Sequence, residues 1–392
     1  MTFSASERVS LGDAGTWLSG GTPLTTELSY WDGNLPWISA KSLTEFHLRD
    51  SDRRLTQLGA QSGTKVVEKN AILMVVRGMS LKTEFRMGIA MRKMAFSQDC
   101  KALIARPGID PLFLAYALKE RTQDILDMVD EAGHGTGRLQ TDLLYALKIA
   151  VPNLDEQRGI AATLGALDDK IESNRRLVGI VEDLIPSKVD ATLGEEQEKI
   201  PVSGLAEFVN GGAYTKGASG TGRMVIRIAE LNSGPGASTV YNDIEVPEDK
   251  TAEPGDILMA WSGSLGVHRW VMGEAIVNQH IFKVKPARKF PPWLVFDRLR
   301  SVMPVFQSIA KDKATTMGHI QRGHLTSTTI EVPSADLIES LDRELRPLWE
   351  RLLVAEQENI RLAELRNALL PELLSGRIRV PEAEEEITEV TL

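Results

Sequence analysis

The chain reads Ala71-Ile72-Leu73-Met74-Val75-Val76-Arg77-Gly78, and about 185 residues later Asp256-Ile257-Leu258-Met259-Ala260-Trp261-Ser262-Gly263. Each stretch is a short apolar run closed by a glycine, which is typical of a buried strand. Three other segments return at similar offsets: Ser97-Gln98-Asp99 as Asn278-Gln279-His280, Ala150-Val151-Pro152 as Glu331-Val332-Pro333, and Leu184-Ile185-Pro186 as Leu369-Leu370-Pro371. A repeat of this size indicates a duplicated domain, not a solenoid unit. The protein should therefore present two similar binding faces.

Each copy ends in a long helical pattern with a heptad seam. The first helix is expected from roughly Asp155 to Leu193, with seam residues Ile160, Leu164, Leu167, Ile171, Asn174, Val178, Val181 and Ile185. The second is expected from roughly Asp336 to Ser375, with seam residues Leu341, Leu345, Leu348, Leu352, Ala355, Asn359, Leu362 and Leu369. One asparagine interrupts each seam. If the helices pair antiparallel, Asn174 and Asn359 meet near the middle, where a lone polar residue fixes the register.

These patterns predict an α+β protein in which two long antiparallel coiled-coil helices join two pseudo-repeated α/β domains. We expect the first globular domain over residues 1–153 and the central helix over 154–199. The second globular domain is expected over 200–334 and the C-terminal helix over 335–380. The acidic tail, residues 381–392, is expected to lack fixed structure.

Composition is that of a globular protein without a membrane segment. The 392 residues, 42% of them hydrophobic, suit two or three domains. The single cysteine, Cys100, excludes an internal disulfide and fits a reducing compartment. The N-terminus lacks a signal-peptide pattern, and no run of about 18 apolar residues exists. We therefore expect a cytoplasmic protein that does not span a membrane.

The net charge of −9 is distributed unevenly along the chain. Residues 151–200 hold 11 acidic and 6 basic side chains, and residues 336–392 hold 14 and 7. The excess acid therefore lies in the two helical segments, and the globular parts are close to neutral. A near-neutral domain can carry a basic patch, which is all that binding to DNA requires. An ordinary mixed surface fits the charge equally well.

The sequence contains no convincing catalytic motif. Phe290-Pro291-Pro292-Trp293 is the segment closest to the Asn/Asp-Pro-Pro-aromatic motif of adenine methyltransferases, but Phe290 cannot accept a hydrogen bond from an amino group. A turn before a helix is the better interpretation. The glycines of residues 133–137 are too loosely spaced for a dinucleotide site, and no phosphate-binding loop of the ATPase type is present.

Candidate metal ligands and nucleophiles are equally sparse. Asp99 with Lys101, and Asp168 with Lys170, match only half of a nuclease carboxylate–lysine motif. The histidines are dispersed, without zinc spacing. We therefore expect no metal, no cofactor and no catalytic residue in this chain, with Cys100 a buried core thiol.

Polar and basic residues do cluster around the repeated apolar strands in both copies. Gln can bridge adenine, Arg can fork onto guanine, and Ser or Lys can hold phosphate. Each such residue taken alone is more often a solvated or capping side chain, so the repetition carries the hypothesis. The candidate DNA-binding residues are Lys41, Arg77, Lys82, Gln98, Lys101 and Arg138 in the first copy, and Arg227, Ser262, Ser264, Gln279, His280, His319 and Arg322 in the second.

Four segments of the chain, taken in order, match one known family. Trp31-Asp32-Gly33-Asn34-Leu35-Pro36-Trp37-Ile38-Ser39 and Gly133-His134-Gly135-Thr136-Gly137 resemble the opening segment and the Gly-Thr loop of the family of Type I restriction–modification specificity subunits. Val151-Pro152-Asn153-Leu154-Asp155-Glu156-Gln157 resembles the Pro-x-x-x-Glu-Gln entry to its central helix. Leu369-Leu370-Pro371-Glu372-Leu373-Leu374-Ser375-Gly376 resembles its closing segment. The resemblance runs from about residue 10 to 380. The second copy departs from it, because Val332-Pro333-Ser334-Ala335-Asp336 lacks Glu-Gln.

The resemblance implies a non-catalytic adaptor. Each globular part would be a target recognition domain that reads one half of a split sequence in double-stranded DNA. The paired helices, about 57 Å long, would set the spacer and dock two methyltransferase subunits, with restriction subunits joining them. S-adenosylmethionine, ATP and magnesium would belong to those partners.

Two other classes of function remain open. The chain could be a self-contained, atypical DNA methyltransferase or nuclease, in which case the purified protein would bind the methyl donor. It could also be a coiled-coil scaffold that binds proteins, in which case salt-dependent DNA binding would be absent. Within the specificity-subunit class, a system that methylates without restricting is not distinguished from one that does both.

Overall fold

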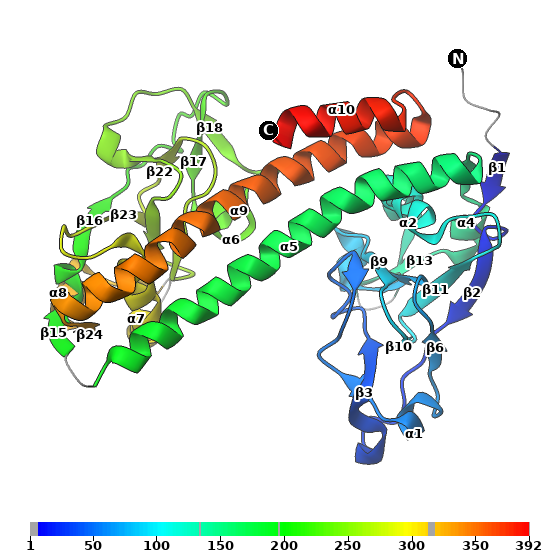
Figure 1. Cartoon of the computed structure of the whole chain (residues 1–392), viewed down its shortest axis with the longest axis horizontal. Helices are drawn as coiled ribbons and strands as arrows, with labels where there is room; N and C mark the ends of the chain where they lie inside the picture. The colour runs from blue at the N-terminus through cyan, green and yellow to red at the C-terminus, as the bar shows by residue number, and fades with distance from the viewer. Residues whose placement is uncertain (1–6, 133–134, 195–196, 313–317, 392) are drawn as a thin grey trace. The chain divides into compact units, whose positions relative to one another are not determined.

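The computed structural model describes residues 7–132, 135–194, 197–312 and 318–391. The chain divides into two compact units. Unit 1 comprises Met1–Asp169 and Leu362–Leu392, and unit 2 comprises Lys170–Arg361. The division falls within two long helices, α5 (Leu154–Thr192) and α9 (Ala335–Ser375), so each unit contains a part of both (Figure 1). The start and end of both helices agree with the heptad patterns to within a residue or two.

Unit 1 is built from short strands with small helices between them. Its strands are β1 (Glu7–Ser10), β2 (Gly15–Ser19), β3 (Trp31–Ile38), β4 (His47–Leu48), β5 (Arg54–Leu55), β6 (Lys65–Val67), β7 (Ile72–Val75), β8 (Arg77–Gly78), β9 (Met87–Ala90), β10 (Met94–Phe96), β11 (Cys100–Ala105), β12 (Val129–Ala132), β13 (Thr136–Leu139) and β14 (Lys148–Val151). Its helices are η1 (Leu28–Tyr30), α1 (Gln57–Ala60), η2 (Met79–Lys82), α2 (Pro111–Glu120), α3 (Thr122–Leu126), α4 (Thr141–Ala146) and α10 (Val380–Thr391).

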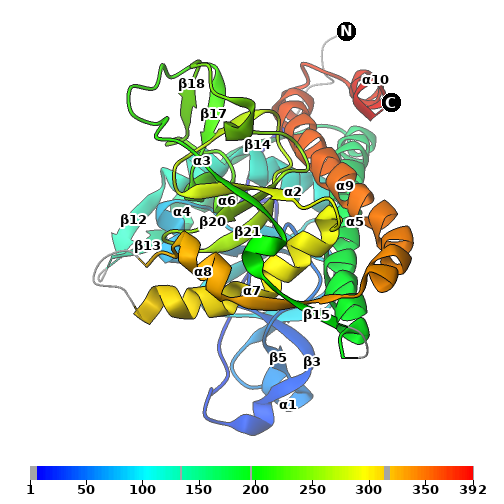
Figure 2. The same cartoon turned by 90° about the vertical axis from the view of Figure 1, so that its left-hand side faces the viewer.

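Unit 2 follows the same plan with fewer strands. Its strands are β15 (Gln197–Pro201), β16 (Ala206–Asn210), β17 (Arg223–Ile226), β18 (Val240–Asn242), β19 (Thr251–Ala252), β20 (Ile257–Ala260), β21 (Gly266–Arg269), β22 (Ala275–Val277), β23 (Ile281–Pro286) and β24 (Thr329–Pro333). Its helices are η3 (Val202–Gly204), α6 (Ile228–Ser233), η4 (Glu248–Lys250), α7 (Pro292–Asp312) and α8 (Arg322–Ser327). Helix α7 packs beside β21 (Figure 2).

The two units share their sheet topology, which confirms the predicted fold class. One four-stranded sheet has the order β5-β3-β10-β6 in unit 1 and β18-β17-β22-β19 in unit 2, each with a parallel pair at its centre. A second sheet has the order β2-β11-β7-β9-β4 in unit 1 and β16-β23-β20-β21 in unit 2. The apolar runs that announced the repeat form β7 and β20, and every residue of both strands is buried. The duplication therefore extends from sequence to strand order.

A Gly-Gly pair crosses the same turn in both units. In unit 1 the N–H groups of Gly20 and Gly21 donate to the carbonyls of Cys100 (3.3 Å) and Phe96 (2.9 Å). In unit 2 the N–H groups of Gly211 and Gly212 donate to Ile281 (2.9 Å) and Val277 (3.1 Å). A Cβ atom at Gly20 or Gly211 would clash with the backbone oxygen of Ser97 or Asn278. Only glycine allows the backbone to pass this closely.

The two long helices run antiparallel within each unit. In unit 2, Lys170 pairs with Glu358 (3.3 Å) and Lys188 with Glu344 (2.8 Å), so residue numbers rise on one helix as they fall on the other. The Asn174 amide donates to Glu358 (2.8 Å), the neighbour of Asn359. In unit 1, Arg366 of α9 pairs with Asp168 of α5. The structure thus places the two seam asparagines close together, and their role in fixing the register stays a prediction.

The acidic tail differs from its prediction. Residues Val380–Thr391 form α10, whereas we expected the tail to lack structure. Val380, Ala383 and Ile387 recur at helical spacing, and Ala383 is fully buried. Gly159 of α5 lies beside Val380, and its missing side chain allows the close approach. The acidic composition wrongly predicted a tail without structure, because the few apolar residues all lie on one face of the helix and can pack there. Within the described residues, no helix is long and apolar enough to cross a membrane.

Candidate nucleic-acid interface

One surface of unit 1 collects the candidate residues of the first copy. Strand β8 pairs with β13, so that Arg77 lies opposite Arg138 and Gly78 opposite Gly137. Ala40, which precedes Lys41, lies beside Gly78, and the Lys82 ammonium lies beside Gly135 of the β12–β13 hairpin. The structure therefore brings Lys41, Arg77, Lys82 and Arg138 into one region, and all four side chains are exposed.

Gln98 lies next to this surface because the residue after it, Asp99, is hydrogen-bonded to the start of β8. The carbonyl of Asp99 accepts hydrogen bonds from the N–H groups of Val76 (2.8 Å) and Arg77 (3.2 Å). Gln98 itself is exposed, and its amide oxygen accepts a hydrogen bond from the Thr22 hydroxyl. The turn that carries Gln98 is thereby held against the start of β8.

The basic residues of this surface differ in whether they are already bound. The Lys82 ammonium pairs with Glu131 (3.2 Å), and Lys101 donates to the Ser19 hydroxyl (3.0 Å). The guanidinium groups of Arg77 and Arg138 make no hydrogen bond or ion pair with any residue that the structure describes. Two unpaired arginines directly opposite each other on adjacent strands repel, and an external anion or acceptor would relieve that repulsion.

Unit 2 builds the equivalent edge from different side chains. Ser262 forms a bridge to His319 in the position that Arg77 and Arg138 occupy in unit 1. The Ile320 N–H donates to Trp261 O (3.0 Å), as the Leu139 N–H donates to Val76 O (2.9 Å). The Trp261 ring lies 5.5 Å from the His280 ring and 6.5 Å from the His319 ring. An aromatic group therefore stands where unit 1 presents aliphatic Val76.

The remaining candidates of unit 2 lie around this edge. Gln279 and His280 are exposed in the turn that matches the Gln98 turn, with 3.4 Å between their side-chain nitrogens. Ser264 is exposed after the Ser262 bridge, and Arg322 is exposed at the first residue of α8. Their contact with DNA stays a prediction.

Arg227 differs from the other candidates because a buried carboxylate holds it. Its guanidinium donates to both oxygens of Glu230, at 3.0 and 2.5 Å, and to the carbonyl of Ser238 at 2.7 Å. Burial favours the neutral form of Glu230, but hydrogen bonds from Arg227 and Thr239 outweigh it and lower the pKa of Glu230. This ion pair holds Arg227 at the N-terminus of α6, where it is the N-cap residue.

The residues that seemed weakly catalytic have structural partners. Asp168 accepts hydrogen bonds from the Tyr116 hydroxyl (2.7 Å) and from Arg366, which ties α2, α5 and α9 together in unit 1. Burial raises the pKa of the Cys100 thiol to about 12, so it stays protonated at neutral pH. Helix α7 begins at Pro292, which confirms that Pro291-Pro292 is a turn before a helix.

The entry motif of the central helix is also structural. Gln157 is buried, its amide oxygen accepts from the Asp110 N–H (2.8 Å), and its amide nitrogen donates to Pro152 O (2.8 Å). In unit 2 a comparable tie uses the Trp293 indole, which donates to Asp342 (2.9 Å). The second copy, which lacks Glu-Gln, has this contact between α7 and α9.

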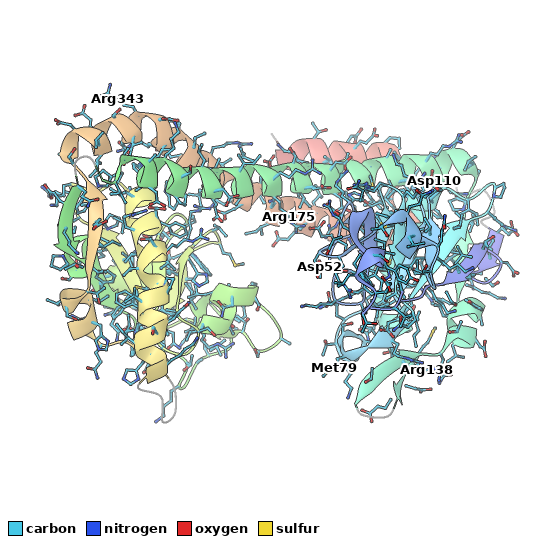
Figure 3. The ribbon with its side chains drawn as sticks, turned by 90° about the horizontal axis from the view of Figure 1, so that it is seen from below. Asp52, Met79, Asp110, Arg138, Arg175 and Arg343 are labelled. Carbon is cyan, nitrogen blue, oxygen red and sulfur yellow. The ribbon has the colours of Figure 1, made fainter. Side chains whose placement is uncertain are left out.

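One exposed residue of the surface was missed by sequence reasoning. Met79 is 75% exposed on η2, directly after the Arg77-Gly78 strand. In Figure 3, Met79 and Arg138 lie at the end of unit 1 that faces away from α5. A large apolar side chain so exposed beside arginines is a signal that only the structure gives. Gly133 and His134, part of the predicted Gly-Thr loop, lie outside the described residues.

Comparison with known proteins shows which proteins this chain is similar to. The model of a family described as the Type I restriction modification DNA specificity domain matches residues 4–179. The EcoR124I/EcoR124II specificity subunit of Escherichia coli is 30% identical over 160 residues, which is 40% of each chain. The MjaIX specificity subunit of Methanocaldococcus jannaschii is 22% identical and aligns with 94% of this chain and 93% of its own length.

A solved structure has the same fold. The S subunit of a Type I restriction–modification system from M. genitalium matches with a TM-score of 0.63 at 16% identity, covering 94% of this chain and 95% of that one. The family model lies on the first copy, and the shared strand order extends the same architecture to the second. Residues 4–179 match the Type I restriction modification DNA specificity domain, and over nearly its whole length the chain is similar to a Type I specificity subunit.

Proposed function

We propose that this chain reads a bipartite DNA target, one half with each unit, within a Type I restriction–modification complex. The observation that carries the proposal is one backbone frame built twice. In each unit, a Gly-Gly crossing, a glutamine-bearing turn and a strand bridge occur in the same topology with matching hydrogen bonds. The side chains on the two frames differ, as expected of two half-sites with different sequences.

In the proposed complex, the partner subunits carry the catalytic groups. We propose that the chain is not itself catalytic and that methyltransferase subunits, two of them, dock along α5 and α9, with restriction subunits joining them. The acidic character of these helices supports contact with protein over contact with DNA. In the proposed complex, S-adenosylmethionine, ATP and magnesium belong to the partner subunits. The structural partners of Asp168 and the protonated Cys100 support this division of labour.

The test is methylome sequencing of a methylation-free host. One strain carries this chain with the methyltransferase gene encoded beside it, and the control strain carries that gene alone. We expect a bipartite motif with methyladenine in both halves only when this chain is present. The same motif without the chain would place recognition elsewhere, and methylation in neither strain would favour the scaffold.

Two further measurements separate the rival functions. The purified chain should not bind S-adenosylmethionine in calorimetry, whereas a self-contained methyltransferase would. DNA binding by the reconstituted complex should weaken steeply as salt is raised, because phosphate contacts release counterions. A scaffold would bind neither S-adenosylmethionine nor DNA.

The proposed role of the helices has its own test. Deleting one heptad from α5, which spans 39 residues, together with the matching heptad of α9 should change the length of the unspecific spacer. Both half-sites should keep their sequences, because the two recognition frames lie outside the deleted segments. An unchanged spacer in the methylome would refute the proposal that the helices set the spacer length.

A further inference from the structure

The two units differ most at the strand bridge next to the glutamine turn. Arg77 and Arg138 are register partners on adjacent antiparallel strands, so their side chains leave the same face of the sheet about 5 Å apart at Cβ. Both side chains are exposed, and neither guanidinium group has a hydrogen bond or ion pair within the described residues. The equivalent bridge in unit 2 joins Ser262 to His319. Unit 1 alone presents two guanidinium groups at this position.

Among the residues that the structure describes, no acid neutralises the arginine pair. Asp130 of β12 is the register partner of Arg138 on its other side. Its carboxylate accepts a hydrogen bond from the Gln140 amide and forms no ion pair with Arg138. The pair is therefore a cost to the free protein that an external acceptor would remove. That acceptor must suit the rigid, planar fork of arginine.

The neighbouring side chains favour a base edge over a phosphate. Gln98 offers an amide and Met79 an exposed apolar group, which are the groups that contact adenine and the thymine methyl. Lys82 and Lys101, which suit phosphate as point charges, are already bound to Glu131 and Ser19.

The shape of the site also fits the major groove. Strands β12 and β13 are an antiparallel pair within the three-stranded sheet β12-β13-β8, and the major groove of B-DNA admits an antiparallel pair of strands. Guanine presents two acceptors there, N7 and O6, and Arg bidentate to them is the commonest specific contact. This pair of strands carries Arg138 on β13, the strand that pairs with β8.

We infer that the half-site read by unit 1 contains one or two neighbouring guanines bound through their major-groove edges by Arg77 and Arg138, and that unit 2 makes no arginine contact at the equivalent position. This inference rests on the proposed function and adds the base that is read. The two halves of the target therefore differ in kind at matched positions. Ser262 and His319 have no forked pair of donors like that of arginine, so they do not require a guanine in the half-site read by unit 2.

The experiment uses the complex of this chain with its methyltransferase subunits and a duplex carrying the methylated target. Each guanine is replaced in turn by 7-deazaguanine, which has a C–H in place of the N7 acceptor. We expect one or two neighbouring guanines, in one half-site only, at which the replacement weakens binding by roughly 5-fold or more. The Arg77→Ala and Arg138→Ala variants should bind the normal target more weakly by a similar factor and lose sensitivity to the replacement.

Two further arms distinguish base from phosphate. Arg77→Lys keeps the charge but loses the fork, so it should keep non-specific affinity and its salt dependence while losing the discrimination. Neutral methylphosphonates placed along the same half-site should weaken binding equally for wild type and the variants. Arg106→Ala, at the other end of β11 and half-exposed, is the matched control and should change neither measurement.

The outcomes separate this inference from the function on which it rests. Specific binding with no guanine whose effect depends on Arg77 or Arg138 overturns the inference and leaves the function intact. The same holds if the variants abolish sensitivity to methylphosphonate instead, because the arginines then hold a phosphate. A complex that shows no sequence-specific binding overturns both. Unchanged thermal midpoints of the variants exclude loss of folding as the cause.

Discussion

Units 1 and 2 use the same backbone frame, but the arginines Arg77 and Arg138 of unit 1 differ in their pairing from Arg227 and Arg269 of unit 2. At the edge of unit 1, Arg77 and Arg138 stand exposed with no partner among the described residues. In unit 2, the Arg227 guanidinium is held by Glu230, and Arg269 is buried against Glu356 (2.7 Å) and over the Trp349 ring (4.4 Å). The difference teaches that residue type alone does not mark a recognition residue. An arginine available to DNA is one that the fold leaves unpaired.

The largest effect on stability should come from breaking the Arg227 pair. Arg227→Met leaves the buried carboxylate of Glu230 with only the Thr239 hydroxyl and the Arg227 backbone N–H as donors. Removing one member of a buried ion pair is strongly destabilising. Because Arg227 is partly exposed and two donors remain, we expect the free energy of unfolding to fall by about 3 kcal/mol. Urea unfolding followed by tryptophan fluorescence measures it.

The matched control for this change is Arg77→Met. Arg77 has no partner to lose, so its substitution should alter the free energy of unfolding by less than about 0.5 kcal/mol. Losses of equal size in the two variants would contradict the distinction between bound and free arginines. A stable Arg227→Met variant that no longer binds its half-site would return Arg227 to the recognition surface.

A smaller effect should follow from filling the Gly-Gly crossing. Gly20→Ala and Gly211→Ala each place a methyl group against a backbone carbonyl, so the turn beside it must move. Forcing a group into packed structure costs about 1–3 kcal/mol. We expect similar losses in both variants and, in the methylome, damage to one half-site in each. Gly273→Ala, where a Cβ meets open space, is the control. Strongly unequal losses would argue that the two frames are not equivalent.

The single thiol makes the comparison sharper because it reports on unit 1 alone. Cys100 is fully buried, and burial raises its pKa to about 12, so almost no thiolate is present at pH 8. We expect slow labelling by a thiol reagent in wild type and in Gly211→Ala, and faster labelling in Gly20→Ala. Fast labelling of the wild-type protein would show that β11 opens without any change to the frame.

The fold could be predicted from sequence because its signals are local and repeated. Apolar runs such as Ile72–Val75 and the heptad seams depend only on neighbouring residues, and the repeat told us that each pattern occurs twice. The buried seam residues, including Leu164, Ile185 and Leu345, follow from that spacing. The tail escaped prediction because its helix is stabilised by packing on Gly159, a contact between residues far apart in the chain.

The site was harder to predict because it depends on which polar groups remain unpaired. Sequence proximity grouped Arg227 with the recognition residues, although Glu230 three residues later has the spacing of a capping pair. It also gave no reason to place Arg77 opposite Arg138, which lie 61 positions apart and meet only through strand pairing. Met79 was overlooked because an isolated methionine reads as core. These assignments require the register of the sheet.

The smallest expected effect is a pH dependence of the unfolding free energy that arises in unit 2. His268 of β21 has its pKa lowered by burial and by the charge of Arg300. The unfolded chain therefore binds a proton more readily than the folded one between the lowered pKa and the ordinary value of about 6.5. Stability should consequently fall as pH drops below about 6.5, since folding there excludes a proton. In His268→Gln, the difference in unfolding free energy between pH 7.5 and pH 5.5 should be smaller than in wild type. Cys100 labelling, which reports on unit 1, should show no such difference between the two proteins. An identical pH dependence of unfolding in wild type and His268→Gln would mean that His268 titrates alike in both states.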